Sequence, residues 1–151
     1  MRKVHAVADM KRAAIAHMET ELAGDVDIVM ATVAPNPVWD IYPIFRAVGF
    51  EAVREMYRRV VPVPLGREIL EEMTRGTDDS DITAWGHNWC IMDFPVNKKK
   101  YPLLSCLIQV YVFEGNLVSS ERVYMIGPDS IRAPVDKLGQ DFFNLPGVTR
   151  Y

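Results

Sequence analysis

Two long strand-type runs, residues 101–114 and 117–126, constrain the fold of this chain more than any other feature, because only Gly115-Asn116 separates them. A two-residue break between apolar, β-branched runs is typical of a tight antiparallel hairpin. Side chains alternate between the faces of a strand, so one face of the first run is wholly apolar: Leu104, Cys106, Ile108, Val110 and Val112. The other face carries Leu103, Ser105, Leu107, Gln109, Tyr111 and Phe113. We expect both faces to be covered, one by the core and the other by a dimer partner or a second layer.

The first half of the chain has a helical pattern. Apolar residues recur at helical spacing, Gly24 is a suitable stop signal, and Asp25 is a suitable cap for a second helix. Helices followed by consecutive antiparallel strands predict an α+β fold, with three N-terminal helices against one face of a curved sheet. The predicted helices are 4–23, 25–31 and 50–61, and the further predicted strands are 38–43, 68–74 and 81–94.

The length of 151 residues suits a single domain. We expect a core at about 4–127 and a C-terminal extension at 128–151, whose apolar residues dock on the body or on a partner. The net charge of −3 argues against nucleic-acid binding. No apolar run reaches the ~18 residues of a membrane span and no signal-peptide pattern opens the chain, so a cytoplasmic protein without membrane contact is expected.

The two cysteines, Cys90 and Cys106, both lie in apolar runs, where buried free thiols are expected. Neither belongs to a CxxC motif, and neither stands at metal-ligand spacing from a histidine. The sequence therefore predicts no structural metal site.

Four segments occur in a characteristic order: "GDVDIVMATVAPNPVW", "YPIFRAVGFEAVREMY", "AWGHNW" and "VYVFEGNLVSSERVYM". Over about residues 5–127 they resemble the nuclear transport factor 2-like superfamily, and within it the SnoaL-like polyketide cyclases and their ketosteroid-isomerase-like relatives. The resemblance implies a cone, in which a bent antiparallel sheet wraps over helices around a deep apolar pocket. It also implies a homodimer formed through the outer face of the sheet. Functions on this fold range from isomerase to scaffold, so the fold does not fix the activity.

Acid–base chemistry in such a pocket needs a carboxylate or histidine with a shifted pKa, and a donor for the developing oxyanion. Asp40 and Tyr42 share a face if "VWDIYP" is extended, and His87 resembles the strand histidine of the SnoaL-like group. Tyr124 keeps the family's tyrosine in the last strand. Each candidate has a structural alternative: a surface carboxylate for Asp40, an aromatic-packed histidine for His87, and core packing for Tyr124.

The chain also departs from the family pattern. Tyr42, not an acid, precedes Pro43, and Ile126 stands where SnoaL-like proteins often have an acid. Glu121 is interpreted as half of an outward ion pair across strands. On a continuous strand at 81–94, two tryptophans would share a face with His87. The aromatic residues expected to wall the ligand site are Trp39, Tyr57, Trp85 and Trp89.

The leading hypothesis is a small enzyme that binds a hydrophobic carbonyl compound. Asp40 or His87 would move a proton without a metal or organic cofactor, as an isomerase, cyclase or dehydratase would, and Tyr42 or Tyr124 would donate to the enolate oxygen. The alternative is a non-catalytic ligand-binding or interaction module with the same cone, which the missing family acids favour. Polar atoms of Asp40 and His87 within ~6 Å in one cavity would favour the enzyme.

Overall fold

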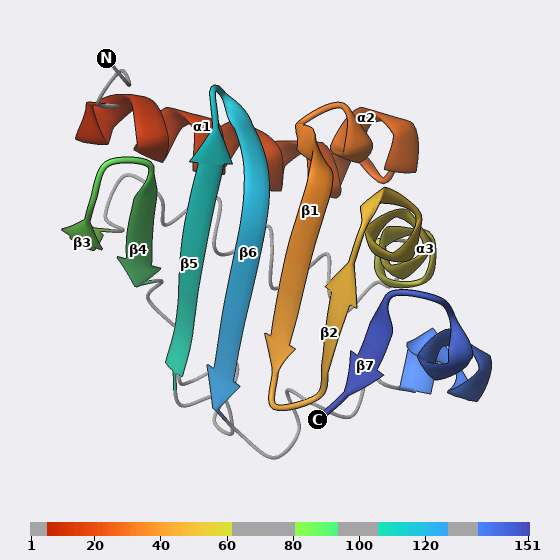
Figure 1. Ribbon diagram of the computed structural model, residues 1–151. Coiled ribbons are helices and arrows are strands. Elements are labelled where there is room, and N and C mark those ends of the chain that lie inside the picture. The colour runs from red at the N-terminus through yellow and green to blue at the C-terminus, as the bar shows by residue number, and fades with distance from the viewer. Residues whose placement is uncertain (1–5, 62–80, 94–105, 127–135) are drawn as a thin grey trace.

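The computed structural model describes residues 6–61, 81–93, 106–126 and 136–151. It confirms the predicted α+β fold, a curved sheet with helices packed against it (Figure 1). The helices are α1 (Val7–Ala23), α2 (Val26–Met30), α3 (Phe50–Val60) and the 3-10 helix η1 (Gln140–Asn144). The strands are β1 (Val33–Tyr42), β2 (Phe45–Val48), β3 (Asp81–Trp85), β4 (Trp89–Asp93), β5 (Cys106–Glu114), β6 (Leu117–Ile126) and β7 (Val148–Arg150).

The strands form one sheet in the order β3-β4-β5-β6-β1-β2-β7. Neighbouring strands are antiparallel except β6 and β1, which run parallel. Helix α1 crosses one end of the sheet and packs against β3, β4 and β6, while α3 packs against β1 and β2 (Figure 1). The core lies between these helices and the face of the sheet turned toward them, which we call the inner face; the opposite face is the outer face.

The predicted helices correspond to α1, α2 and α3. Gly24, with a φ of 76°, ends α1, and its N–H bonds back to the Glu21 carbonyl. The Asp25 side chain accepts hydrogen bonds from the backbone N–H groups of Asp27 and Ile28 and so caps α2. Within the described ranges, no helix has the length and hydropathy needed to cross a bilayer.

The predicted hairpin at Gly115-Asn116 is confirmed as the turn between β5 and β6. Gly115 has a φ of 63°, a conformation that favours glycine. The part of the predicted strand at 101–105 lies outside the described residues. The inner face of β5 carries buried Gln109, Tyr111 and Phe113, and its outer face carries half-buried Ile108, Val110 and Val112. The wholly apolar face of this strand is therefore turned away from the helices.

The prediction of one strand over 81–94 is wrong. The segment forms two antiparallel strands, β3 and β4, joined by a turn at 86–88. The N–H of Gly86 donates to the Trp89 carbonyl at 2.9 Å, and a Cβ on Gly86 would overlap the Trp89 indole. Glycine therefore permits the close approach that reverses the chain here. As a result, no single strand face carries Trp85, His87 and Trp89 together.

Two further strand predictions need correction or completion. The predicted fragment at 38–43 is the end of the longer strand β1, and β2 was not predicted. The predicted strand at 68–74 lies outside the described residues. Cys90 on β4 is buried and free, as predicted, and burial raises the pKa of its thiol to about 12. The side chain of Cys106 lies outside the described part of the chain.

The C-terminal segment packs on the body, which was one of the two alternatives. Strand β7 pairs with β2 at the edge of the sheet. Phe142 of η1 is buried against Phe45, with ring centroids 5.1 Å apart. Arg59 of α3 donates two hydrogen bonds to the Asp141 carboxylate at 3.0 and 2.8 Å. These contacts fix η1 beside α3 and β2.

Candidate functional site

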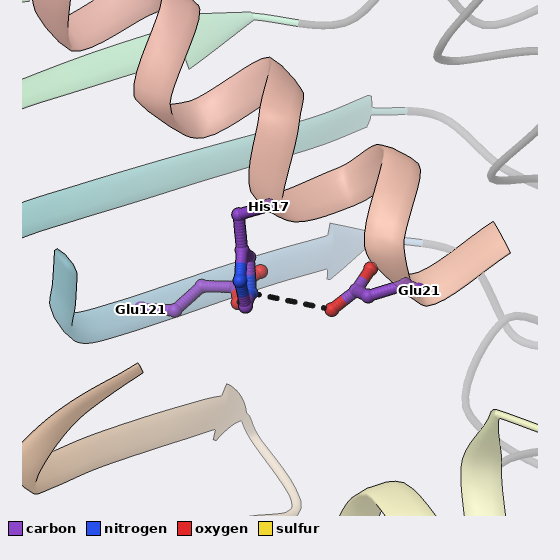
Figure 2. Close-up of side chains that lie close together, drawn as sticks. All are labelled: His17, Glu21 and Glu121. Carbon is purple, nitrogen blue, oxygen red and sulfur yellow. Dashed lines mark ion pairs between the residues drawn. The ribbon is translucent and has the colours of Figure 1, made fainter. Parts of the chain in front are cut away.

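A cluster of ionisable side chains lies buried between α1 and the inner face of the sheet. His17 and Glu21 come from α1 and Glu121 comes from β6, and Figure 2 shows the three side chains converging. The His17 Nε2 atom lies 3.5 Å from an oxygen of Glu21 and 3.5 Å from Oε2 of Glu121. The His17 side chain is fully buried, and the side chains of Glu21 and Glu121 are 10% and 4% exposed. Three ionisable groups thus share a site that is almost closed to solvent.

The local sequence places these groups by simple periodicity. Residues four apart lie on the same face of a helix, so Glu21 follows His17 one turn later on the buried face of α1. On β6, side chains alternate: Glu121 and Val123 are buried on the inner face, and Arg122 between them is exposed. The sequence interpretation of Glu121 as an outward group is therefore wrong.

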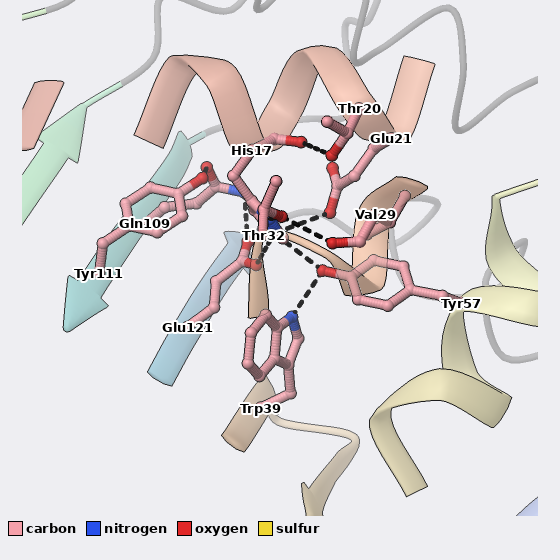
Figure 3. A network of polar contacts seen from close by, with 10 residues as sticks. All are labelled: His17, Thr20, Glu21, Val29, Thr32, Trp39, Tyr57, Gln109, Tyr111 and Glu121. Carbon is pink, nitrogen blue, oxygen red and sulfur yellow. Dashed lines mark hydrogen bonds and ion pairs between the residues drawn. The ribbon is translucent and has the colours of Figure 1, made fainter. Parts of the chain in front are cut away.

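The hydrogen bonds of Thr32 fix the tautomer of His17. The Thr32 hydroxyl lies 2.6 Å from His17 Nδ1 and 2.6 Å from the Val29 carbonyl (Figure 3). A hydroxyl has one proton to donate, and the carbonyl can only accept it. Thr32 therefore accepts from the N–H at Nδ1, which leaves Nε2 of His17 directed at the two glutamates.

Tyr57 and Trp39 complete the Nε2 side of the cluster. The Tyr57 hydroxyl lies 3.0 Å from Nε2 of His17. The same hydroxyl accepts a hydrogen bond from the Trp39 indole N–H at 2.9 Å. Because the indole can only donate, the hydroxyl proton of Tyr57 remains available for a partner at the cluster.

Glu121 is hydrogen-bonded at one oxygen, whereas its other oxygen has only the ion-pair contact with His17. Oε1 accepts a hydrogen bond from the Gln109 amide at 3.0 Å, and the Gln109 carbonyl oxygen accepts one from the Tyr111 hydroxyl at 2.5 Å (Figure 3). Oε2 is buried and has no hydrogen-bond partner in the described structure. A buried carboxylate oxygen without a hydrogen-bond partner is costly, so Oε2 is a natural position to contact a ligand atom.

The net effect of burial and mutual charge is to raise the pKa values of His17 and Glu21. Burial lowers the pKa of His17, but the contact with Glu121 and the charges of Glu21 and Glu121 outweigh it, and the net shift is upward. Burial, together with the charge of Glu121, raises the pKa of Glu21 to about 7. Burial also raises the pKa of Tyr57 and of Tyr111 far above the ordinary phenol value. The phenols therefore remain donors, while Glu21 can exchange a proton near neutral pH.

Asp40, a predicted base, lies on the outer face and is committed to other partners. Arg46 donates two hydrogen bonds to its carboxylate at 2.7 and 3.0 Å, and the Tyr151 hydroxyl donates a third. Arg122 lies 3.5 Å away. Burial acts to raise the pKa of Asp40, but these partners outweigh it and hold the pKa below its usual value.

The predicted donors Tyr42 and Tyr124 also lie outside the cluster. The two strands that carry them are paired in register, with Tyr42 beside Tyr124. Their ring centroids are 5.7 Å apart, and Tyr42 also lies 5.8 Å from the ring of Tyr151. They form an aromatic group on the outer face, next to Asp40.

His87 lies in the turn between β3 and β4 and is half-buried. Strand β4 is three strands away from β1, so His87 and Asp40 are separated by about 14 Å or more across the sheet. The structure does not bring these two predicted residues together. Trp85 and Trp89 flank the same turn and are 57% and 36% exposed.

The structure does bring two predicted ligand-site residues to the buried cluster, Trp39 and Tyr57. The residues that the sequence reasoning missed are His17, Glu21 and Glu121. A detectable signal was present: a histidine and a glutamate four residues apart on the apolar stripe of a predicted helix. Polar groups on a buried stripe need partners, and this need points to a polar group on the sheet opposite.

Solved structures share the fold of this chain. No family model and no curated protein matches it. A de novo designed protein with a curved β-sheet is similar over 93% of this chain and 98% of its own, at 9% identity and a TM-score of 0.53. A protein of unknown function with a cystatin-like fold, from Methylobium petroleophilum PM1, is similar over 83% of this chain and 80% of its own, at 12% identity and a TM-score of 0.50. An NTF2-like protein of unknown function from Burkholderia xenovorans LB400 is similar over 80% and 85%, at 14% identity and a TM-score of 0.45.

The likenesses to the designed protein and to the cystatin-like protein confirm the predicted curved-sheet, cystatin-like fold. At identities this low they establish the fold alone, and the SnoaL-like subgroup stays a prediction. The chemistry must be argued from the residues of the cluster.

Proposed function

We propose that the protein binds a small, largely apolar carbonyl compound against the inner face of the sheet, and that His17 transfers a proton to or from it. The observation that carries the proposal is the convergence, in one buried site, of His17 Nε2 and Glu121 Oε2, an oxygen without a hydrogen-bond partner in the described structure. Buried ionisable groups with shifted pKa values cluster at functional sites because such a site needs them and a core does not.

Each neighbour of His17 has a role in such a transfer. The Nδ1–H is held by Thr32, so the neutral ring presents the Nε2 lone pair as a base. When Nε2 takes a proton, the carboxylates of Glu121 and Glu21 stabilise the imidazolium. Tyr57 keeps its proton and is polarised by the Trp39 N–H, so it is the donor for a developing enolate oxygen.

The proposal moves the proton-transfer role from Asp40 or His87 to His17. Asp40 is engaged by Arg46 and Tyr151, and a carboxylate stabilised as an anion in this way is a poor base at neutral pH. The donor role moves from Tyr42 or Tyr124 to Tyr57, which is the tyrosine in contact with His17.

A non-catalytic binding module is the second candidate. The observation in its favour is that protein partners hold much of the cluster, since Thr32 engages His17 and Gln109 engages Glu121. A network satisfied in this way also specifies a core without performing chemistry. In this case the same residues would bind the polar group of a ligand and leave it unchanged.

The decisive experiment is deuterium exchange at carbon, measured by NMR in D₂O with a panel of apolar ketones and β-diketones. We expect the wild type to accelerate exchange at the position α to the carbonyl, and His17→Gln to lose about 100-fold or more of this acceleration. Tyr57→Phe should lose less, and Glu114→Gln, an exposed glutamate at the end of β5, is the matched control. Exchange that is equal in His17→Gln and the wild type would refute the proposal. Binding of a ketone without exchange would instead support the binding module.

The homodimer remains a proposal. The half-buried apolar residues of β5 on the outer face, Ile108, Val110 and Val112, support it, because a second copy would cover them. Light scattering coupled to size-exclusion chromatography would give the mass of the protein in solution, and Val110→Glu should convert a dimer to a monomer. A wild-type mass of one chain at micromolar concentration would contradict the dimer.

A further inference from the structure

We propose that His17, Glu21 and Glu121 form a binding site for one divalent transition-metal ion of the zinc type. One nitrogen and two carboxylate oxygens of these residues all lie within 4.8 Å of one another (Figure 2). The side chains reach this position from two elements, α1 and β6, and are buried. Imidazole and carboxylate are the ligands that such ions take when no thiolate is present.

The spacing of the ligand atoms suits a tetrahedral ion. Zinc binds nitrogen and oxygen ligands at about 2.0–2.2 Å, so two ligands of a tetrahedral ion lie about 3.4 Å apart. Nε2 of His17 lies 3.5 Å from an oxygen of Glu21 and 3.5 Å from Oε2 of Glu121. An ion could therefore be accommodated with small side-chain movements.

A second observation points independently to a ligand at this place. Oε2 of Glu121 is buried, faces His17 and has no hydrogen-bond partner in the described structure. The other oxygen of the same carboxylate is paired with Gln109. A cation between Oε2 and Nε2 would satisfy the unpaired oxygen and would offset the repulsion between the two glutamates.

The residues behind the ligands are arranged as metal sites require. A metal-binding histidine usually donates its other ring N–H to a fixed acceptor, which orients the ring. Here Nδ1 of His17 donates to Thr32, and Gln109 donates to Glu121 and is itself held by Tyr111. The Tyr57 hydroxyl, 3.0 Å from Nε2, is placed to contact a fourth ligand such as water.

This inference goes beyond the proposed function and does not rest on it. Metal ligands must be deprotonated, so a cation and a proton compete for Nε2 of His17. A loaded site could not use His17 as a base, and zinc should therefore suppress carbon-proton exchange. Metal binding itself needs no carbonyl ligand to be observed.

The test is a titration of chelator-treated protein with Co²⁺, followed by visible absorption, and with Zn²⁺, followed by calorimetry in buffers of different ionisation enthalpy. We expect one equivalent to bind, with the strong visible bands of tetrahedral Co²⁺ and with release of protons. Glu121→Gln should weaken binding about 100-fold or more, and Thr32→Val, which removes the hydroxyl that supports the histidine but no metal ligand, about 10-fold.

Two controls keep the outcome clear. Glu114→Gln repeats the same change on an exposed glutamate, and His87→Ala removes a histidine outside the cluster; neither should alter the affinity. Circular dichroism confirms that each variant is folded. The absence of a saturable equivalent would overturn the inference, and so would binding that survives Glu121→Gln or that is lost in His87→Ala. Carbon-proton exchange in the presence of a chelator tests the proposed function separately.

Discussion

Two buried carboxylates on adjacent strands show how differently the two faces of this sheet use the same chemical group. In the parallel pairing of β1 and β6, Trp39 lies beside Glu121, and Asp40 lies beside Arg122. A step of one residue thus moves from the inner face to the outer face. The side chains of Asp40 and Glu121 are similarly buried, at 6% and 4% exposure.

The partners decide what each carboxylate can do. Asp40 is matched by Arg46, whose guanidinium does not release its proton, so Asp40 keeps its charge at neutral pH. Glu121 is matched by His17, an imidazole that can take up and release a proton, and its carboxylate helps to raise the pKa of that ring. The outer carboxylate therefore holds Tyr151, the residue after β7, against the sheet, while the inner one lies beside Glu21, whose pKa is raised to about 7.

The largest expected effect comes from removing the imidazole. His17→Ala leaves Glu21 and Glu121 buried without their cationic partner, and breaking a buried pair in this way costs about 3 kcal/mol or more. We expect this loss in the free energy of unfolding, measured by urea denaturation at pH 6. His87→Ala, in the turn between β3 and β4, should change it by less than about 0.5 kcal/mol. A cost below about 1 kcal/mol for His17→Ala would mean that the cluster is not coupled to folding.

The second expected effect is a pH dependence that belongs to the inner cluster. Glu21 has a pKa of about 7 in the folded protein against an ordinary value of 4.5, so between these values the folded state holds more protons than the unfolded state. Stability must therefore fall as the pH rises through this window, and the raised pKa of His17 acts in the same direction. Each pKa unit corresponds to about 1.4 kcal/mol.

Glu21→Gln is neutral at every pH and should remove this part of the dependence. Between pH 5 and pH 8, we expect the free energy of unfolding of the variant to fall by at least about 1 kcal/mol less than that of the wild type. Urea denaturation at a series of pH values would measure this difference. Glu114→Gln, which is exposed, should follow the wild type. Parallel curves for Glu21→Gln and the wild type would show that Glu21 is not protonated in the folded state.

The sequence predicted the fold well because periodic patterns report local structure. The three helices and the turn at Gly115-Asn116 follow from caps, apolar spacing and turn residues. The same reasoning failed at Gly86, because two flanking tryptophans hid a turn inside a run of strand-forming residues. Because the chain reverses at Gly86, the side chains of β3 and β4 do not follow the alternation expected of one continuous strand.

The site was less predictable because it depends on which face of each element meets another. Trp39 and Tyr57 were predicted from their type, whereas His17 and Glu121 are 104 residues apart in sequence and meet only through the packing of α1 on the sheet. Side chains alternate between the two faces of a strand, so Glu121 and Asp40 point to opposite faces only because of the register in which β6 and β1 pair. That register could be assigned only after β1 and β6 were known to be parallel neighbours.

The smallest expected effect tests the outer carboxylate and completes the contrast. Asp40→Asn weakens the paired hydrogen bonds from Arg46 and should cost about 1 kcal/mol at pH 7, because Arg46 is partly exposed. Tyr151→Phe, which removes one donor, should cost about half as much. The pKa of Asp40 is lowered on folding, so its contribution is present above its unfolded pKa and disappears as the pH falls through the folded value. The penalty of Asp40→Asn should thus shrink in acid, whereas the instability caused by Glu21 grows toward alkaline pH. If the penalty of Asp40→Asn grew above pH 7 instead, the outer carboxylate would be linked to the titrating cluster, and the division of roles between the two faces would fail.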